Sequence, residues 1–291
     1  MKRAILYSKV VSLSLLLIAC NNEKTAQYNN GPTAQDQLDL SQTYGYKNSS
    51  PFKTNIVDCI QVNTADSCNL QTLPLIGMED TSPDINTIMA RVVVSHDWMG
   101  QRFEETLEQL PNEILPLFSA VTAIVIDSNI RPSFYTTETG AVYIDPRYLW
   151  LSVAEKQTIS TASDYRSTFS DPLNFKVLSR YLINDTRAYL NASLTDNSTR
   201  NISDIKLAFA RLMFHELAHA NDFIPRDTYT NLSPEQSVTE AISSLANERI
   251  SNQLYAQLPL ASDTLFLLAG IMYKGHNPSP FALELSALEV G

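Results

Sequence analysis

The chain has 291 residues, of which 44% are hydrophobic, so it is long enough to bury a large core and is not disordered as a whole. Its formal net charge is −10, from 31 acidic and 21 basic residues, and the sequence contains no basic block. An acidic chain of this kind is poorly suited to the phosphate backbone, so nucleic acid is not an expected partner.

The first 19 residues have the pattern of an export signal. A basic start is followed by an apolar run over residues 10–19 that is too short for a comfortable membrane span. The run ends in Leu17-Ile18-Ala19-Cys20, which resembles the lipobox of bacterial lipoproteins. The resemblance implies a signal peptide over residues 1–19, lipid on Cys20 as a membrane anchor and, because Asn21 is the next residue, an outer-membrane location in the cell envelope. An ordinary signal peptide that ends at a cysteine is the alternative.

The chain has three cysteines, and if Cys20 carries lipid, Cys59 and Cys68 remain. Export would place them in an oxidising compartment, where we expect a disulfide that closes a small loop. Two free buried thiols would be more typical of a cytosolic protein, which conflicts with the signal.

Residues 20–50 are polar, rich in Asn, Gln, Thr and Ser, and without helical or alternating periodicity. We predict that this segment is a flexible tether between the lipid and the folded part. Beyond it there is no repeat and no second linker of this composition, so the sequence predicts a single domain over residues 51–291.

Residues 86–94 form an apolar stretch that periodicity alone does not assign to helix or strand. Apolar side chains at helical spacing over residues 102–118 predict a helix, which Pro111 breaks. Residues 121–126 and 141–144 are apolar and rich in β-branched side chains, so both are predicted strands.

The last third of the chain is predicted to be mainly helical. A helix is expected from Ser203, a candidate N-cap, until Pro225 forbids continuation. A second helix is expected to open at Ser233, with Pro234 at its first position, and to reach about residue 257. The apolar residues 265–273 are long enough for a third, buried helix.

The helix from Ser203 contains the strongest motif, Phe214-His215-Glu216-Leu217-Ala218-His219, which matches HExxH. Residues four apart lie on one helix face, so His215 and His219 can bind a single ion, and zinc (Zn²⁺) suits imidazole ligands. Glu216 can take a proton from metal-activated water and pass it to the leaving amine, as a general base and then a general acid. The alternative is a helix with two ordinary core or surface histidines.

This motif and the residues downstream of it resemble the zincin zinc metallopeptidases. The metzincin pattern does not fit, because Asp222 stands at its glycine position and Pro225 at its third ligand. Thr239-Glu240-Ala241-Ile242-Ser243-Ser244 instead resembles the NExxSD stretch of the gluzincins, the thermolysin-like families. The resemblance implies Glu240 as third ligand and an α+β zincin fold with a small mixed sheet. Thr239 and Ser244 depart from the asparagine and aspartate of that stretch.

Other residues are candidates for the same site. Asp222 shares a helix face with both histidines and is expected to accept the second N–H of an imidazole; Glu248 is a lesser candidate ligand. Tyr273 and His276 lie downstream, as oxyanion donors do in related families. By resemblance, residues 140–145 are a candidate edge strand that binds an extended peptide, although an ordinary buried strand fits equally well.

These observations predict a zinc-dependent, membrane-tethered peptidase whose substrate is a peptide or protein. The alternative is a non-catalytic envelope lipoprotein that uses the zinc site structurally, as a binding module. The motif does not separate an enzyme directed at proteins from one that cleaves cell-wall peptides.

Overall fold

The computed structural model describes residues 38–61, 68–162, 182–183, 186–187, 194–195 and 197–257. Pro32–Asn252 form one compact unit, and the other unit, Met1–Gly31 with Gln253–Gly291, lies almost wholly outside the described residues. The predicted export signal, Cys20, Tyr273 and His276 are outside them too. Within the described ranges, no helix is both long and apolar enough to cross a membrane.

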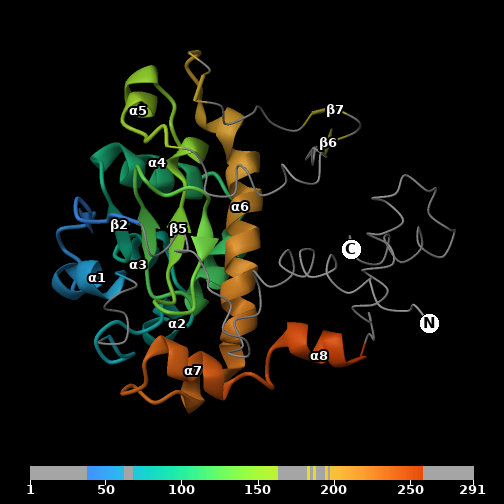
Figure 1. Ribbon diagram of the computed structural model, residues 1–291. Helices are drawn as coiled ribbons and strands as arrows, with labels where there is room; N and C mark the ends of the chain where they lie inside the picture. Colours follow the sequence, from blue (N-terminus) through green and yellow to red (C-terminus); the bar gives the residue numbers. More distant parts are fainter. Residues whose placement is uncertain are drawn as a thin grey trace, which may run out of the picture. The chain divides into compact units, whose positions relative to one another are not determined.

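A small five-stranded sheet lies beside the long helix α6 (Figure 1). Its strands, in the spatial order β1-β2-β3-β5-β4, are β1 (Tyr44–Gly45), β2 (Val92–Val94), β3 (Ile124–Ile126), β5 (Val142–Ile144) and β4 (Phe134–Tyr135). The central strands β2, β3 and β5 are parallel, and the two edge strands are antiparallel to their neighbours. A separate pair is formed by β6 (Leu182–Ile183) and β7 (Thr186–Arg187). The mixed sheet with helices confirms the predicted α+β class and both predicted strands.

The helices of the described chain complete the fold. They are α1 (Lys53–Cys59), α2 (Ile76–Glu79), α3 (Ile85–Met89), α4 (Asp97–Leu107), α5 (Val153–Gln157), α6 (Ile202–Phe223), α7 (Val238–Ser244) and α8 (Ile250–Gln257), with 3₁₀ helices η4 (Asn112–Ala120), η5 (Pro146–Tyr148) and η7 (Arg226–Asn231). The undecided stretch 86–94 divides into α3 and β2. The helix predicted over 102–118 starts earlier, at Asp97, and becomes 3₁₀ after Pro111.

The three parallel strands are buried on both faces, which explains their unbroken apolar sequences. Val92 and Val94 face one hydrophobic core, which also receives residues of α4, η4 and α6, whereas Val93 faces a second core that contains Ile56 of α1. Successive side chains of the strand therefore point to opposite faces of the sheet, as in any strand, but both faces are covered by a hydrophobic core.

The predicted tether boundary at residue 50 is wrong. Leu40 is 3% exposed and belongs to the second core, and β1 pairs with β2. Tyr46 packs against Gly100 of α4 so closely that a Cβ at that glycine would lie 2.4 Å from the tyrosine ring. A few apolar side chains spaced through a polar segment are enough to anchor it, so its average composition misled the prediction.

The predicted disulfide between Cys59 and Cys68 is present, with sulfur atoms 1.99 Å apart. Cys59 is the last residue of α1 and is buried, so the bridge ties the end of this helix to the segment that begins at residue 68.

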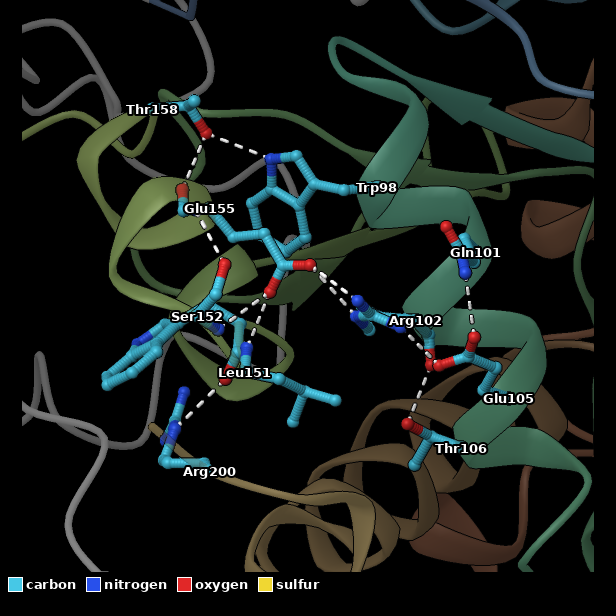
Figure 2. Close-up of polar contacts among 11 residues, drawn as sticks. Trp98, Gln101, Arg102, Glu105, Thr106, Leu151, Ser152, Glu155, Thr158 and Arg200 are labelled. Carbon is cyan, nitrogen blue, oxygen red and sulfur yellow. Dashed lines mark hydrogen bonds and ion pairs between the residues drawn. The ribbon is translucent and has the colours of Figure 1, made fainter. Parts of the chain in front are cut away.

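A network of polar contacts connects α4 to the capping box of α5 (Figure 2). Arg102 donates from Nε and Nη2 to one carboxylate oxygen of Glu155, at 3.0 and 2.7 Å. The other oxygen accepts the backbone N–H groups of Leu151 and Ser152, at 2.7 and 3.0 Å. Since α4 packs against α6, this network helps to set where α6 lies.

The start of α6 is anchored from the same region. Arg200 donates Nε–H to the carbonyl oxygen of Trp150 at 2.9 Å, and its guanidinium carbon lies 3.4 Å from the centre of the indole ring. Asn201, and not the predicted Ser203, is the N-cap, and it forms a capping box with Asp204. The predicted end of this helix before Pro225 is confirmed.

The helix predicted over residues 233–257 is wrong in its start and its continuity. Before α7, the carbonyl of Gln236 accepts the N–H of Leu70 at 2.9 Å, so this segment pairs with a distant one instead of turning into a helix. The helix begins only after Ser237, which forms its own capping box, and α7 and α8 are separate. Both serines carry a capping signal, and the tertiary pairing selects the second.

Two buried tyrosines, each in a different hydrophobic cluster, provide a test of the packing. Tyr143 donates its hydroxyl to the carbonyl of Ile60 at 2.5 Å, whereas the hydroxyl of Tyr229 is buried with no hydrogen-bond partner in the described part of the chain. Tyr143→Phe should lower the free energy of unfolding by about 1–3 kcal/mol because it leaves a buried carbonyl unpaired. Tyr229→Phe should leave it within about 0.5 kcal/mol of wild type, or raise it. Urea unfolding of both variants measures the difference, and equal losses would contradict the assignment.

Candidate functional site

The buried face of α6 determines where the motif residues point. Phe209, Met213 and Leu217 are fully buried in the sheet-facing core. Each residue advances about 100° around the helix, so His215 lies on the opposite, exposed side and His219 is half-buried beside it. Glu216 is rotated toward the interior and is only 5% exposed.

The two imidazoles converge. His215 Nε2 and His219 Nε2 are 3.3 Å apart, and the ring planes are nearly perpendicular, at 88°. Two nitrogens bound at about 2.05 Å to one tetrahedral zinc ion would be separated by about 3.3 Å. The distance between the two nitrogens, which also allows an imidazole–imidazole hydrogen bond, is therefore the one expected for two ligands of a tetrahedral zinc ion.

The pair is also biased toward the neutral form that binds metals. Burial lowers the pKa of His215, and the neighbouring His219 and Arg211 lower it further. Burial lowers the pKa of His219 as well, while the carboxylate of Asp222 acts in the opposite direction. Both rings therefore carry an unprotonated nitrogen at neutral pH.

The structure does not bring the predicted third ligand, Glu240, to this pair. Glu240 is the third residue of α7, where its carboxylate accepts the N–H of Ser237 at 2.9 Å and its N–H donates to the Ser237 hydroxyl at 3.2 Å. Among the described residues, no group of three His, Cys, Asp or Glu side chains is placed to hold a metal ion, and the role of Glu248 as a ligand stays a prediction. The capping box, which depends on the late start of α7, keeps the carboxylate of Glu240 at its own helix end.

Asp222 lies on the same side of α6 as the histidines, as predicted, and its carboxylate has a partner that sequence reasoning missed. Oδ1 accepts the N–H of Ser251 at 2.8 Å, and Oδ2 accepts the hydroxyl of the same residue at 2.5 Å. The sequence contains no local signal for this contact because the two residues are 29 positions apart. An acceptor role toward His219 stays a prediction.

Of the two interpretations of residues 140–145, the ordinary buried strand is confirmed and the edge strand is not. Residues 142–144 form β5, which lies inside the sheet between β3 and β4. The edge is β4, which contacts α6, and its Tyr135 ring stacks on Phe223 with the ring centres 5.9 Å apart. The adjacent aromatic residues at 134 and 135 were the only strand signal, and two residues are too few for a periodicity.

We predict that protonation of the histidine pair destabilises the metal-free protein. Both folded-state pKa values are lowered from 6.5, so between 6.5 and those lower values the unfolded chain binds more protons. The free energy of unfolding should therefore fall as the pH falls from 6.5 through the folded pKa values. Urea unfolding with chelator, at about pH 7.5 and about pH 5, should show a smaller drop for the double variant His215→Asn, His219→Asn than for wild type. An equal drop would contradict the prediction.

A second prediction separates the two roles considered for Glu240. Glu240→Gln preserves the capping box, because glutamine can also accept the N–H of Ser237, but it removes a carboxylate ligand. We expect zinc affinity within about twofold of wild type and unchanged stability, since the structure assigns this residue to the helix end. Chelator competition measures the affinity, and a loss of tenfold or more would restore Glu240 as a ligand.

The chain matches no protein-family model, no curated protein and no solved structure in the three comparisons made. The case for a function therefore depends on the histidine pair and its surroundings.

Proposed function

We propose that this protein is a zinc-dependent hydrolase of peptide bonds, with His215 and His219 as zinc ligands and Glu216 as general base. The observation that carries the proposal is the 3.3 Å separation of the two Nε2 atoms, which matches a zinc tetrahedron. The lowered pKa values of both rings support it, because ligation needs neutral imidazole.

Each motif residue has a distinct part in this chemistry. His215 and His219 would hold the zinc ion, which would act as a Lewis acid and bring the pKa of a water molecule close to neutrality. Glu216 is the residue next to His215 and is 5% exposed, so its carboxylate is surrounded by protein rather than bulk water. In the proposed reaction Glu216 accepts the proton of the attacking water and delivers it to the departing amine.

The edge position of β4, whose two residues are half-buried, motivates a peptide as the substrate. An extended peptide can add to an exposed sheet edge through backbone hydrogen bonds. The contact between Tyr135 of β4 and Phe223 places this strand beside the last turn of α6, one turn after His219. A peptide bound along β4 would therefore lie close to the histidine pair.

The location in the cell stays part of the proposal. The lipobox-like ending at Cys20 supports an envelope protein attached to the outer membrane by lipid. The disulfide between Cys59 and Cys68 is consistent with such an oxidising compartment.

One observation favours a second function, a non-catalytic envelope protein that uses zinc to build a binding module. Glu216 is buried while His215 lies on the exposed side, and the described residues include no group of three potential metal ligands. A site of this kind can bind zinc without activating water.

The test compares wild type with Glu216→Gln, which keeps the size of the side chain and removes the base. We expect both proteins to bind one zinc ion each, and the variant to cleave a peptide library at least about 100-fold more slowly. The control variant His215→Asn, His219→Asn should lose both zinc and cleavage. Metal analysis and mass spectrometry of the digests measure these outcomes.

Three results would change the conclusion. Unchanged cleavage by Glu216→Gln would rule out this mechanism. A wild-type protein that binds zinc but cleaves neither peptides nor cell-wall peptides would establish the binding module. A wild-type protein that binds no zinc would show that the histidine pair is not a metal site.

A further inference from the structure

The contact between Asp222 and Ser251 joins the histidine-bearing helix to the start of α8. Ser251 is the second residue of α8 and donates both its N–H and its hydroxyl to the carboxylate of Asp222, at 2.8 and 2.5 Å. Each carboxylate oxygen receives one of these bonds, so within the described part of the chain Ser251 holds both oxygens of Asp222.

Asp222 and His219 are three positions apart on α6, where side chains are neighbours on one helix face. An ionised carboxylate offers about four acceptor positions, and Ser251 uses one on each oxygen. Asp222 therefore retains acceptor capacity for a further N–H donor.

A second contact holds the same two segments together. The guanidinium carbon of Arg249 lies 4.6 Å from the centre of the Phe223 ring, and Arg249 also donates to the carbonyl of Ile242 at 3.4 Å. Two consecutive residues of α6, 222 and 223, thus contact two residues around the start of α8. This pairing leaves Ser251 little freedom to shift along Asp222.

Metal binding requires one particular tautomer of His219. Nε2 of His219 points at Nε2 of His215, so metal binding at this position requires the proton to sit on Nδ1. An Nδ1–H group that donates to a fixed carboxylate stabilises this tautomer and ring orientation.

We propose that Ser251 is a positioning residue of the metal centre: it fixes the carboxylate of Asp222, which in turn accepts Nδ1–H of His219. The inference rests on the proposed zinc site. It makes the start of α8 part of that site, although Ser251 itself touches no metal ligand.

The test measures zinc affinity by chelator competition and the visible spectrum of the cobalt-substituted full-length protein. Removing a partner of a metal ligand typically weakens metal binding by about 10-fold to 100-fold. We expect a loss in this range for Asp222→Asn and a loss of at least about threefold for Ser251→Ala, with an altered cobalt spectrum in both. Ser251→Thr keeps the hydroxyl and should restore affinity and spectrum.

The double variant Asp222→Asn, Ser251→Ala shows whether Ser251 acts through Asp222. If it does, Ser251→Ala has no further effect on zinc affinity once Asp222 is changed. One control variant accompanies it. Ser243→Ala removes an exposed hydroxyl of α7 that bonds only within its own helix, so this variant should bind zinc like wild type.

The outcomes distinguish this inference from the proposed function. If wild type binds no zinc, the metal site itself fails. If wild type binds zinc and Ser251→Ala binds it equally well with the same cobalt spectrum, the positioning role is overturned. In that case a lower melting temperature of Ser251→Ala would identify the contact as a helix cap only.

Discussion

The candidate site depends on how α6 is rotated about its axis. Phe209, Met213 and Leu217 are each fully buried, and burying a side chain of this size contributes roughly 1.5–3 kcal/mol. A rotation that exposed them would lose most of that contribution, so the apolar side of the helix must face the sheet. This rotation also fixes the positions of the polar residues, because their angles around the helix are set by the sequence: His215 is exposed and Glu216 is buried.

The elements that surround α6 come from widely separated parts of the chain. The residue before its N-cap, Arg200, packs on Trp150, and its last turn contacts β4 through Phe223 and α8 through Asp222. Contacts at both ends restrict how far the helix can tilt or slide. A site that needs two rings within a few tenths of an ångström benefits from such restraint, since loosely held ligands bind metal poorly.

The carboxylates of Glu240 and Asp222 make similar contacts with different consequences. Both accept the backbone N–H of a serine at the start of a helix. Glu240 caps its own helix, so its carboxylate is used locally. Asp222 lies in the last turn of α6 and caps the start of α8. Its interaction therefore connects two helices, while the residue stays on the same face of α6 as His219.

Local rules were sufficient where the signal is local. The spacing of apolar residues predicted α6, and the spacing of His215 and His219 predicted convergent rings, because both depend only on helix geometry. Unbroken apolar runs predicted β3 and β5, and the number of cysteines left after lipidation predicted the disulfide. Local rules failed for β1 and β4, which are two residues long and exist only because a neighbouring strand pairs with them.

The sequence by itself thus determined the strands β3 and β5, the long helix and the pair of imidazoles, since these are set by periodicity and by burial of apolar surface. Only the tertiary structure decided which serine starts α7, which strand forms the sheet edge and which residue binds Asp222. The physical reason is that each of these depends on a hydrogen-bond partner far away in the chain: Leu70 for Gln236, β5 for β4 and Ser251 for Asp222. Local propensity offers several equivalent choices at such positions, and long-range pairing selects among them.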